Sequence, residues 1–120
     1  MANPNIVAVS SIYANTVFDA DVAASAVSLL TCGSDKVQKI NSLVIANIDG
    51  TNAASIDVWI TRSSADYYLA KTISVPADAT LVVIDKNMGL YLMESDILKI
   101  QASAAGDLSA VLSYEEIDDA

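Results

Sequence analysis

Two carboxylate pairs are close enough in the sequence to raise the question of acid–base chemistry. Glu94 and Asp96 are two residues apart in a polar segment that is typical of a turn. Glu115 and Glu116 are adjacent in a segment that alternates like a β-strand, so their side chains should point to opposite faces. A glycosidase needs two carboxyl groups that flank one bond. Neither pair is expected to meet that need, and we assign no catalytic residue.

Acidic and amide residues also form two small groups that could be tested as calcium ligands. Asp19 and Asp21 are two residues apart, and Asp49, Thr51 and Asn52 share one short segment. Calcium needs several such oxygens to converge on one point, and neither group has the spacing of a known binding loop. Aspartate is also an ordinary turn residue. The sequence therefore predicts turns at these positions and no metal site.

The sequence contains no histidine and a single cysteine, Cys32. This composition excludes Ser-His-Asp and Cys-His catalysis, zinc sites built on histidine or paired cysteines, and a disulfide within the chain. Cys32 follows an apolar run and precedes the turn residues Gly33 and Ser34, which favours a buried thiol. We expect a protein that is not an enzyme and that carries no cofactor.

Three aromatic residues are candidates for a binding or contact surface. Trp59 lies in one predicted strand, and Tyr67 and Tyr68 begin the next. Rings of this kind can form a platform for carbohydrate, because they supply contact area at a low cost in conformational entropy. The alternative is packing in the core or against another subunit, and we favour it over a glycan platform.

The elements that must position these residues are β-strands. The chain has 120 residues, 53% of them hydrophobic and 18% charged, which supports one folded domain and excludes disorder. Val, Ile, Thr and Tyr recur with a period of two between polar turns. The sequence predicts an all-β fold, a single antiparallel β-sandwich that is jelly-roll-like and spans residues 1–120. The strand-forming runs are 6–9, 12–13, 16–18, 26–31, 37–48, 55–62, 67–75, 81–85, 90–92, 97–102 and 108–117.

Two segments carry more specific expectations. Asp49-Gly50 lies between two apolar runs and is a strong hairpin signal, because both residue types tolerate positive φ. Residues 19–31 are open to two interpretations. Good helix formers follow Asp21, which could cap a helical turn over 21–27, whereas residues 26–31 have the composition of a strand.

The charge balance limits the possible partners. Six Lys and Arg against fifteen Asp and Glu give a formal net charge of −9. Nucleic-acid phosphates and anionic membrane surfaces would repel such a chain, so we expect no nucleic acid and no membrane among its partners. Its apolar runs are far shorter than the roughly 20 residues that span a bilayer. Its first residues do not resemble a signal peptide.

Several strands are apolar on both faces, which indicates contact with another subunit. Neighbours such as Leu43 and Val44, Val82 and Val83, or Val111 and Leu112 would place apolar side chains on the two sides of a sheet, whereas a strand of an isolated sandwich usually has one polar face. We therefore expect a homo-oligomer. Residues 1–10 are predicted to be an N-terminal arm or edge strand that reaches a neighbour. The candidate interface residues are Ala2, Asn3, Pro4, Asn5, Ile6, Val7, Trp59, Tyr67 and Tyr68.

Longer motifs in the second part of the chain are similar to those of a known group of proteins. They are Lys71–Ile84 (KTISVPADATLVVI), Leu90–Ile100 (LYLMESDILKI), Gly106–Leu108, Val111–Glu116, Lys39–Leu43 and Ala46–Asn52. With these motifs, residues 36–117 resemble small virion structural proteins of tailed phages, especially phages that infect cyanobacteria. One departure is that the usual pattern has Glu-Gly-Asp before the penultimate strand, where this chain has Glu94-Ser95-Asp96. The motifs describe strands and turns and contain no reactive group.

The resemblance implies a component of the virion without enzymatic activity. The favoured expectation is a capsid decoration (cement) protein that stabilises a phage head, as a homotrimer bound to the major capsid protein or another virion protein. The alternatives are a neck, tail or fibre-attachment component, or a module that binds host glycans.

Overall fold

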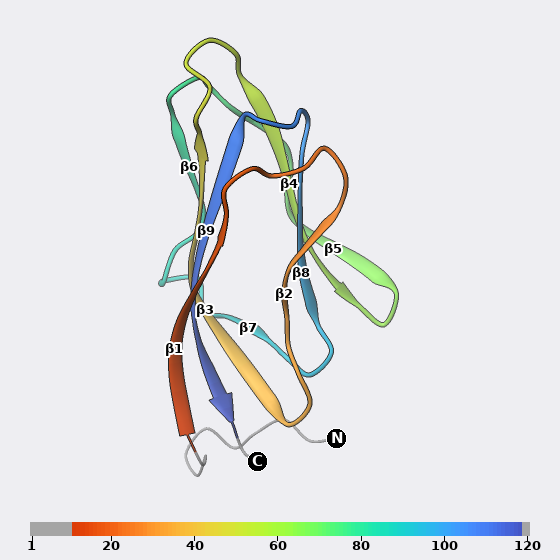
Figure 1. Ribbon diagram of the computed structural model, residues 1–120. Coiled ribbons are helices and arrows are strands. Elements are labelled where there is room, and N and C mark those ends of the chain that lie inside the picture. The colour runs from red at the N-terminus through yellow and green to blue at the C-terminus, as the bar shows by residue number, and fades with distance from the viewer. Residues whose placement is uncertain (1–10, 119–120) are drawn as a thin grey trace.

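The computed structural model describes residues 11–118, and in this range it contains nine β-strands in two antiparallel sheets that pack face to face (Figure 1). None of these residues belongs to a helix that is long and apolar enough to cross a membrane. The strands are β1 (Ser11–Asp19), β2 (Val27–Thr31), β3 (Lys36–Asn47), β4 (Ala54–Arg62), β5 (Ala65–Val75), β6 (Thr80–Ile84), β7 (Leu90–Leu92), β8 (Ile97–Ala102) and β9 (Leu108–Asp118). The predicted all-β sandwich is confirmed.

The strand order is that of a jelly roll. One sheet, here called the β1 sheet, has the order β1-β9-β3-β6, and the other, the β2 sheet, has the order β2-β8-β4-β5. β7 also pairs with β3, at Gln38–Ile40, whereas β6 pairs with β3 at Leu43–Ala46. Since β9 occupies the other side of β3, β6 and β7 lie end to end as one interrupted edge strand. The fold then has the eight strand positions of a jelly roll.

The core lies between the two sheets and follows from the period of two in the sequence. In β4, for example, Ala54, Ile56 and Val58 are buried, while Ser55 and Asp57 alternate with them and are partly exposed. Successive side chains of a strand point to opposite faces, so each sheet contributes every second residue to the core. The largest fully buried apolar side chains are Ile40, Leu43, Ile45, Ile56, Ile84, Leu92, Leu98, Ile100, Leu108, Leu112 and Val22.

The prediction of a hairpin at Asp49-Gly50 is wrong. β3 ends before it in the β1 sheet, and β4 begins after it in the β2 sheet, so this segment crosses between the sheets. Asn47 holds the crossover, because its Nδ2 donates to the carbonyl oxygens of Asn52 (3.0 Å) and Val75 (2.9 Å). Asp49 Oδ1 accepts the Thr51 N–H at 2.8 Å, which makes a local turn.

The hairpin that the structure does contain joins β4 to β5 through Ser63 and Ser64. Their φ angles are 52° and 66°, and Arg62 pairs with Ala65, as in a two-residue type I′ turn. Asn-Gly or Asp-Gly is the usual sequence for such a turn, so the serine pair gave no hairpin signal.

The N-terminal third also differs from the expectation in its boundaries. The helical turn considered for residues 21–27 is absent, because the chain bends there from one sheet to the other and β2 begins at Val27. Val22 is fully buried and donates its N–H to the Leu108 oxygen at 2.9 Å, so tertiary contacts decide this segment. The runs 12–13 and 16–18 belong to one strand, β1. The predicted strand 6–9 and the candidate arm lie outside the described residues.

Candidate interaction surface

The carboxylates of Glu94 and Asp96 both serve structural contacts. Glu94 Oε2 accepts the Asp35 N–H at 2.7 Å. Asp96 is 1% exposed and accepts two hydrogen bonds from Arg62, from Nε at 2.7 Å and from Nη2 at 2.5 Å, and a third from the Met93 N–H at 2.8 Å. Burial by itself raises the pKa of Asp96, but these hydrogen bonds and the Arg62 charge outweigh it and lower the pKa. Asp96 therefore stays ionised, with both oxygens occupied.

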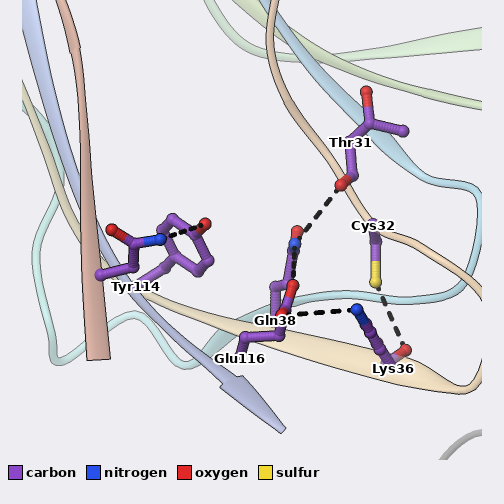
Figure 2. Close-up of polar contacts among 7 residues, drawn as sticks. Thr31, Cys32, Lys36, Gln38, Tyr114 and Glu116 are labelled. Carbon is purple, nitrogen blue, oxygen red and sulfur yellow. Dashed lines mark hydrogen bonds and ion pairs between the residues drawn. The ribbon is translucent and has the colours of Figure 1, made fainter. Parts of the chain in front are cut away.

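Glu115 and Glu116 have separate partners and do not act on one point. Glu115 Oε1 accepts from Asn41 Nδ2 at 3.4 Å. Glu116 accepts from Gln38 Nε2 at 3.1 Å, and its other oxygen lies 3.6 Å from Lys36 Nζ (Figure 2). Successive residues of β9 point to opposite sides of the sheet, as the sequence predicts.

Gln38 and Cys32 belong to a polar network at one end of the core (Figure 2). Gln38 is 2% exposed and its Nε2 also donates to the Thr31 oxygen at 3.3 Å, which ties β3 to β2. Cys32 is buried and its Sγ donates to the Lys36 oxygen at 3.3 Å. Burial first, and then the negative charges of Asp96 and Glu116, raise the pKa of Cys32 to about 11. The thiol is therefore neutral at ordinary pH and is not a nucleophile.

The candidate calcium ligands are engaged in turns. Asp21 Oδ1 accepts the Gly106 N–H at 2.6 Å, and Asp49 accepts from Thr51 and Asn52. Those hydrogen bonds lower the pKa of Asp49. Desolvation, followed by a hydrogen bond with Asp49 and the charge of Asp49, raises the pKa of Asp107. Across residues 11–118, no group of three acidic or cysteine side chains is placed to hold a metal ion.

The structure brings together two of the three candidate aromatic residues. The Trp59 and Tyr68 ring centroids are 5.3 Å apart, and Lys71 Nζ lies 4.7 Å from the Tyr68 centroid. Trp59 is only 5% exposed, and its Nε1 is buried without a hydrogen-bond partner. Tyr67 points to the other side of β5, because it precedes Tyr68 in a strand. The three rings therefore do not form a single platform.

Tyr67 contributes to an open cavity at the side of the sandwich. The cavity has a volume of about 270 Å³ and is lined by Ile60, Arg62, Tyr67, Leu90 and Tyr91. The two tyrosines and Arg62, together with the aliphatic side chains, give it both apolar and polar walls. A small polar molecule with an apolar face, such as a sugar ring, has the right chemistry for such a site.

A row of apolar side chains crosses the outer face of the β1 sheet. Phe18 pairs with Val111, Val111 with Val44, and Val44 with Val82, so the four residues lie side by side on four strands. Phe18, Val82 and Val111 are 71%, 56% and 38% exposed. Because the neighbouring Val17, Leu112 and Leu43 face the core, these four point outward. We call Phe18, Val44, Val82 and Val111 the apolar row.

The residues on either side of the apolar row are small and uncharged. Thr16, Ser113 and Ser42 flank it on one side, and Ser109, Ala46 and Thr80 on the other. The sequence predicts Val44, Val82 and Val111 as apolar residues on a second strand face, but it predicts neither Phe18 there nor the alignment of the four. That alignment depends on strand register, which the sequence does not show.

No protein-family model matches the sequence, and no curated protein does. Solved structures that are similar include a protein of Bacillus endospore appendages, which form a family of disulfide-linked pili. That protein is 17% identical to this chain, with a TM-score of 0.55, and the match covers 100% of this chain and 96% of that one. Infectious bursal disease virus VP2 is 14% identical, with a TM-score of 0.48, over 92% of this chain and 34% of that one. A pentameric capsid protein from metagenomic phage sequences is 17% identical, with a TM-score of 0.43, over 87% and 62%. At this identity, the likeness to the pilus protein shows a shared fold.

Proposed function

We propose that this chain is a non-enzymatic structural protein of a virion, and that it is a capsid decoration (cement) protein which binds the major capsid protein of a phage head as a homo-oligomer. The observation that carries the proposal is the outer face of the β1 sheet. Its apolar row and uncharged flanks lie on a chain whose net charge is −9. An exposed apolar surface of this kind is typical of a protein–protein contact.

Two further observations support a structural role. The acidic side chains that could have formed a catalytic pair are held in hydrogen bonds to Arg62, Asn41, Gln38 or backbone N–H groups. The motifs of residues 36–117 resemble those of small phage virion proteins, and the fold is one that a pilus protein also uses to build a polymer.

The proposal includes the interface expected from the sequence. The N-terminal arm, with Ala2–Val7, would reach a neighbouring subunit, and Tyr67 and Tyr68 are exposed enough, at 59% and 46%, to contribute to a contact. Trp59 would act beneath Tyr68, because it is itself buried. A trimer is the oligomer expected on the head. A neck, tail or fibre-attachment position would use the same outer face on another virion protein.

The test is binding of the recombinant chain to phage particles from which the native copies have been stripped. We expect saturable co-sedimentation and, by cryo-EM, density at symmetric positions on the head with the β1 sheet facing the shell. Binding confined to the tail or neck would favour the alternative position. Failure to bind any part of the particle would contradict the proposal.

The cavity beside Tyr67 favours a second candidate function, a module that binds host glycans. Its two tyrosines and Arg62 can stack against and hydrogen-bond a sugar ring. If this function is correct, the chain binds host-surface polysaccharide in calorimetry, and Tyr67→Ala removes the binding without changing the circular dichroism spectrum. Lack of heat with the wild-type chain would exclude it.

A further inference from the structure

Each sheet of the sandwich has two edge strands, and exposed edges are sites where another chain can pair. In the described residues the edges are β1 and the β6–β7 strand in one sheet, and β2 and β5 in the other. An edge strand presents unpaired N–H and C=O groups, and soluble proteins protect such edges with bulges, short strands and charged residues. An edge strand that lacks these protective features is therefore the one available for pairing with another chain.

Three of the four edges are protected. In β5 the register shifts twice, opposite Ile56–Trp59, and Thr72 has a φ of 52° with its N–H bonded to Asp57 Oδ1 at 2.6 Å. β2 is five residues long and contains a register shift between Ser28 and Leu30. β6 and β7 have five and three residues and are separated by a segment that contains Asp85 and Lys86. Each irregularity or break interrupts the row of groups that a partner would need.

β1 has none of these devices. Its nine residues pair with β9 in an unbroken register from Ser11 to Asp19. It contains no proline, and it carries no charge before Asp19 at its end. Ile12, Tyr13 and Phe18 are 55%, 57% and 71% exposed. A long, regular and partly apolar edge of this kind favours pairing with another strand.

We infer that β1 pairs with β1 of a second copy, antiparallel and around a two-fold axis, so that the two β1 sheets become one continuous sheet. The other edges of the described fold are protected, which leaves β1 as the matching strand. Two chains of net charge −9 repel each other, and β1 brings them together over residues 11–18, where neither has a charged side chain. Backbone hydrogen bonds and the exposed Ile12, Tyr13 and Phe18 would supply the attraction.

The groups that would form these bonds can be identified. The Thr16 N–H donates to the side chain of Asn15 at 2.8 Å, which places this N–H away from the ladder with β9. Alternate residues of a strand direct their backbone groups to the same side, so Ile12, Ala14, Thr16 and Phe18 face the free edge. Pairing would exchange the Asn15 contact for a carbonyl oxygen of the second copy.

This inference specifies one contact of the proposed homo-oligomer, and it rests on that proposal because it takes a second copy of the chain as the partner. A two-fold contact is compatible with a separate three-fold contact, since dihedral assemblies contain both. It predicts an even number of chains, because each β1 is matched by another.

The test is sedimentation of the full-length chain and of Ala14→Pro. Proline at position 14 removes an N–H that faces the free edge, which an edge strand tolerates, but it blocks the intermolecular ladder. We expect a wild-type assembly with an even number of chains, and half that number in the variant. If the proline variant fails to fold, Ala14→Lys serves instead, with Ala65→Lys as its control, because both alanines are exposed in edge strands. Only the change at position 14 should halve the assembly.

The outcomes separate this inference from the proposed function. An oligomer that survives Ala14→Pro and Ala14→Lys, or one with an odd number of chains, overturns β1 pairing and leaves the structural role intact. An oligomer lost on deletion of residues 2–9 but kept in the position 14 variants assigns assembly to the N-terminal arm and likewise overturns β1 pairing. A wild-type chain that stays monomeric at high concentration contradicts both the β1 pair and the proposed homo-oligomer.

Discussion

Among single residues, Asp96 is the buried carboxylate on which the loops at one end of the sandwich depend. Its partner Arg62 is 54% exposed, so the pair is only partly removed from water. Arg62→Ala would leave Asp96 with the Met93 N–H alone and should lower the free energy of unfolding by about 1–3 kcal/mol. Arg62→Lys is the matched control, which keeps the charge and should have a smaller effect. Urea unfolding measures both changes.

The same pair also determines a response to acid. The pKa of Asp96 is lowered in the folded chain, so its contribution to stability is present above the unfolded pKa and is lost as the pH falls through the folded value. In Arg62→Ala, burial would raise that pKa, so a fall in pH would no longer remove stability through Asp96, and the difference in unfolding free energy between the variant and the wild type should shrink in acid. Unfolding free energies measured at a series of pH values below 7 would show it. Identical acid profiles for the two proteins would contradict this assignment.

Cys32 gives a prediction at the opposite end of the pH scale. Its pKa is raised to about 11 in the folded chain, so the fold favours the neutral thiol. Stability from this group is complete below the unfolded pKa and decreases as the pH rises toward the folded value. A thiol reagent such as Ellman's reagent should react with Cys32 at pH 8 only after unfolding in guanidinium chloride. Rapid reaction of the native protein would show that the thiol is accessible.

At the scale of the elements, the turn between β7 and β8 is where this chain departs from the pattern of the phage proteins that it resembles. Ser95 has a φ of 70°, a conformation that L-residues other than glycine adopt at a cost. The resembling phage proteins have glycine at this position. Ser95→Gly should therefore stabilise the fold by about 0.5–1 kcal/mol, since the strain removed exceeds the added freedom of the unfolded chain. Ser34→Gly, in a turn without a positive φ at that residue, is the control and should not stabilise in thermal unfolding.

The strands were predictable because their pattern is local. Alternation such as Ile56, Val58 and Ile60 against Asp57 and Thr61 needs no knowledge of the partner strand, and these residues do form β4. The connections were harder to predict. Asp49-Gly50 carries a hairpin sequence but crosses between sheets, because β3 already has β9 on one side and β6 and β7 on the other. A turn sequence permits a hairpin, and strand pairing elsewhere decides whether one forms.

The candidate surface was predictable only in part for the same reason. Val44, Val82 and Val111 could be identified as apolar residues on a second strand face, since each has an apolar neighbour in sequence. Their alignment with Phe18 depends on strand register, and Val44 meets Val82 through a register shift between Leu43 and Val44, where β3 pairs with β6. No local pattern encodes such a shift. The aromatic candidates show the opposite case. Tyr67 and Tyr68 are adjacent in sequence, but their side chains point to opposite sides of β5.

For the whole molecule, the distribution of charge separates assembly from solubility. A chain with net charge −9 repels another copy, and the apolar row with its flanks and the edge of β1 are two uncharged parts of the surface that meet at Phe18. The edge would join copies of the chain, and the face would remain available for the shell. Away from Phe18, which belongs to both, the two contacts can therefore be changed independently.

Val82→Lys tests the face without touching the edge of β1. Val82 is 56% exposed on the far strand of the β1 sheet, so the variant should keep its unfolding free energy to within about 0.5 kcal/mol. A lysine buried without a partner in a protein contact should weaken binding to stripped phage particles at least ~10-fold, or about 1.4 kcal/mol. Ile48→Lys is the control, because Ile48 is 57% exposed and lies outside the apolar row. Equal binding of the two variants would show that the apolar row is not the contact with the shell. Selective loss of binding in Val82→Lys, with its sedimentation unchanged, would assign shell binding to the outer face of the β1 sheet and self-association to another surface.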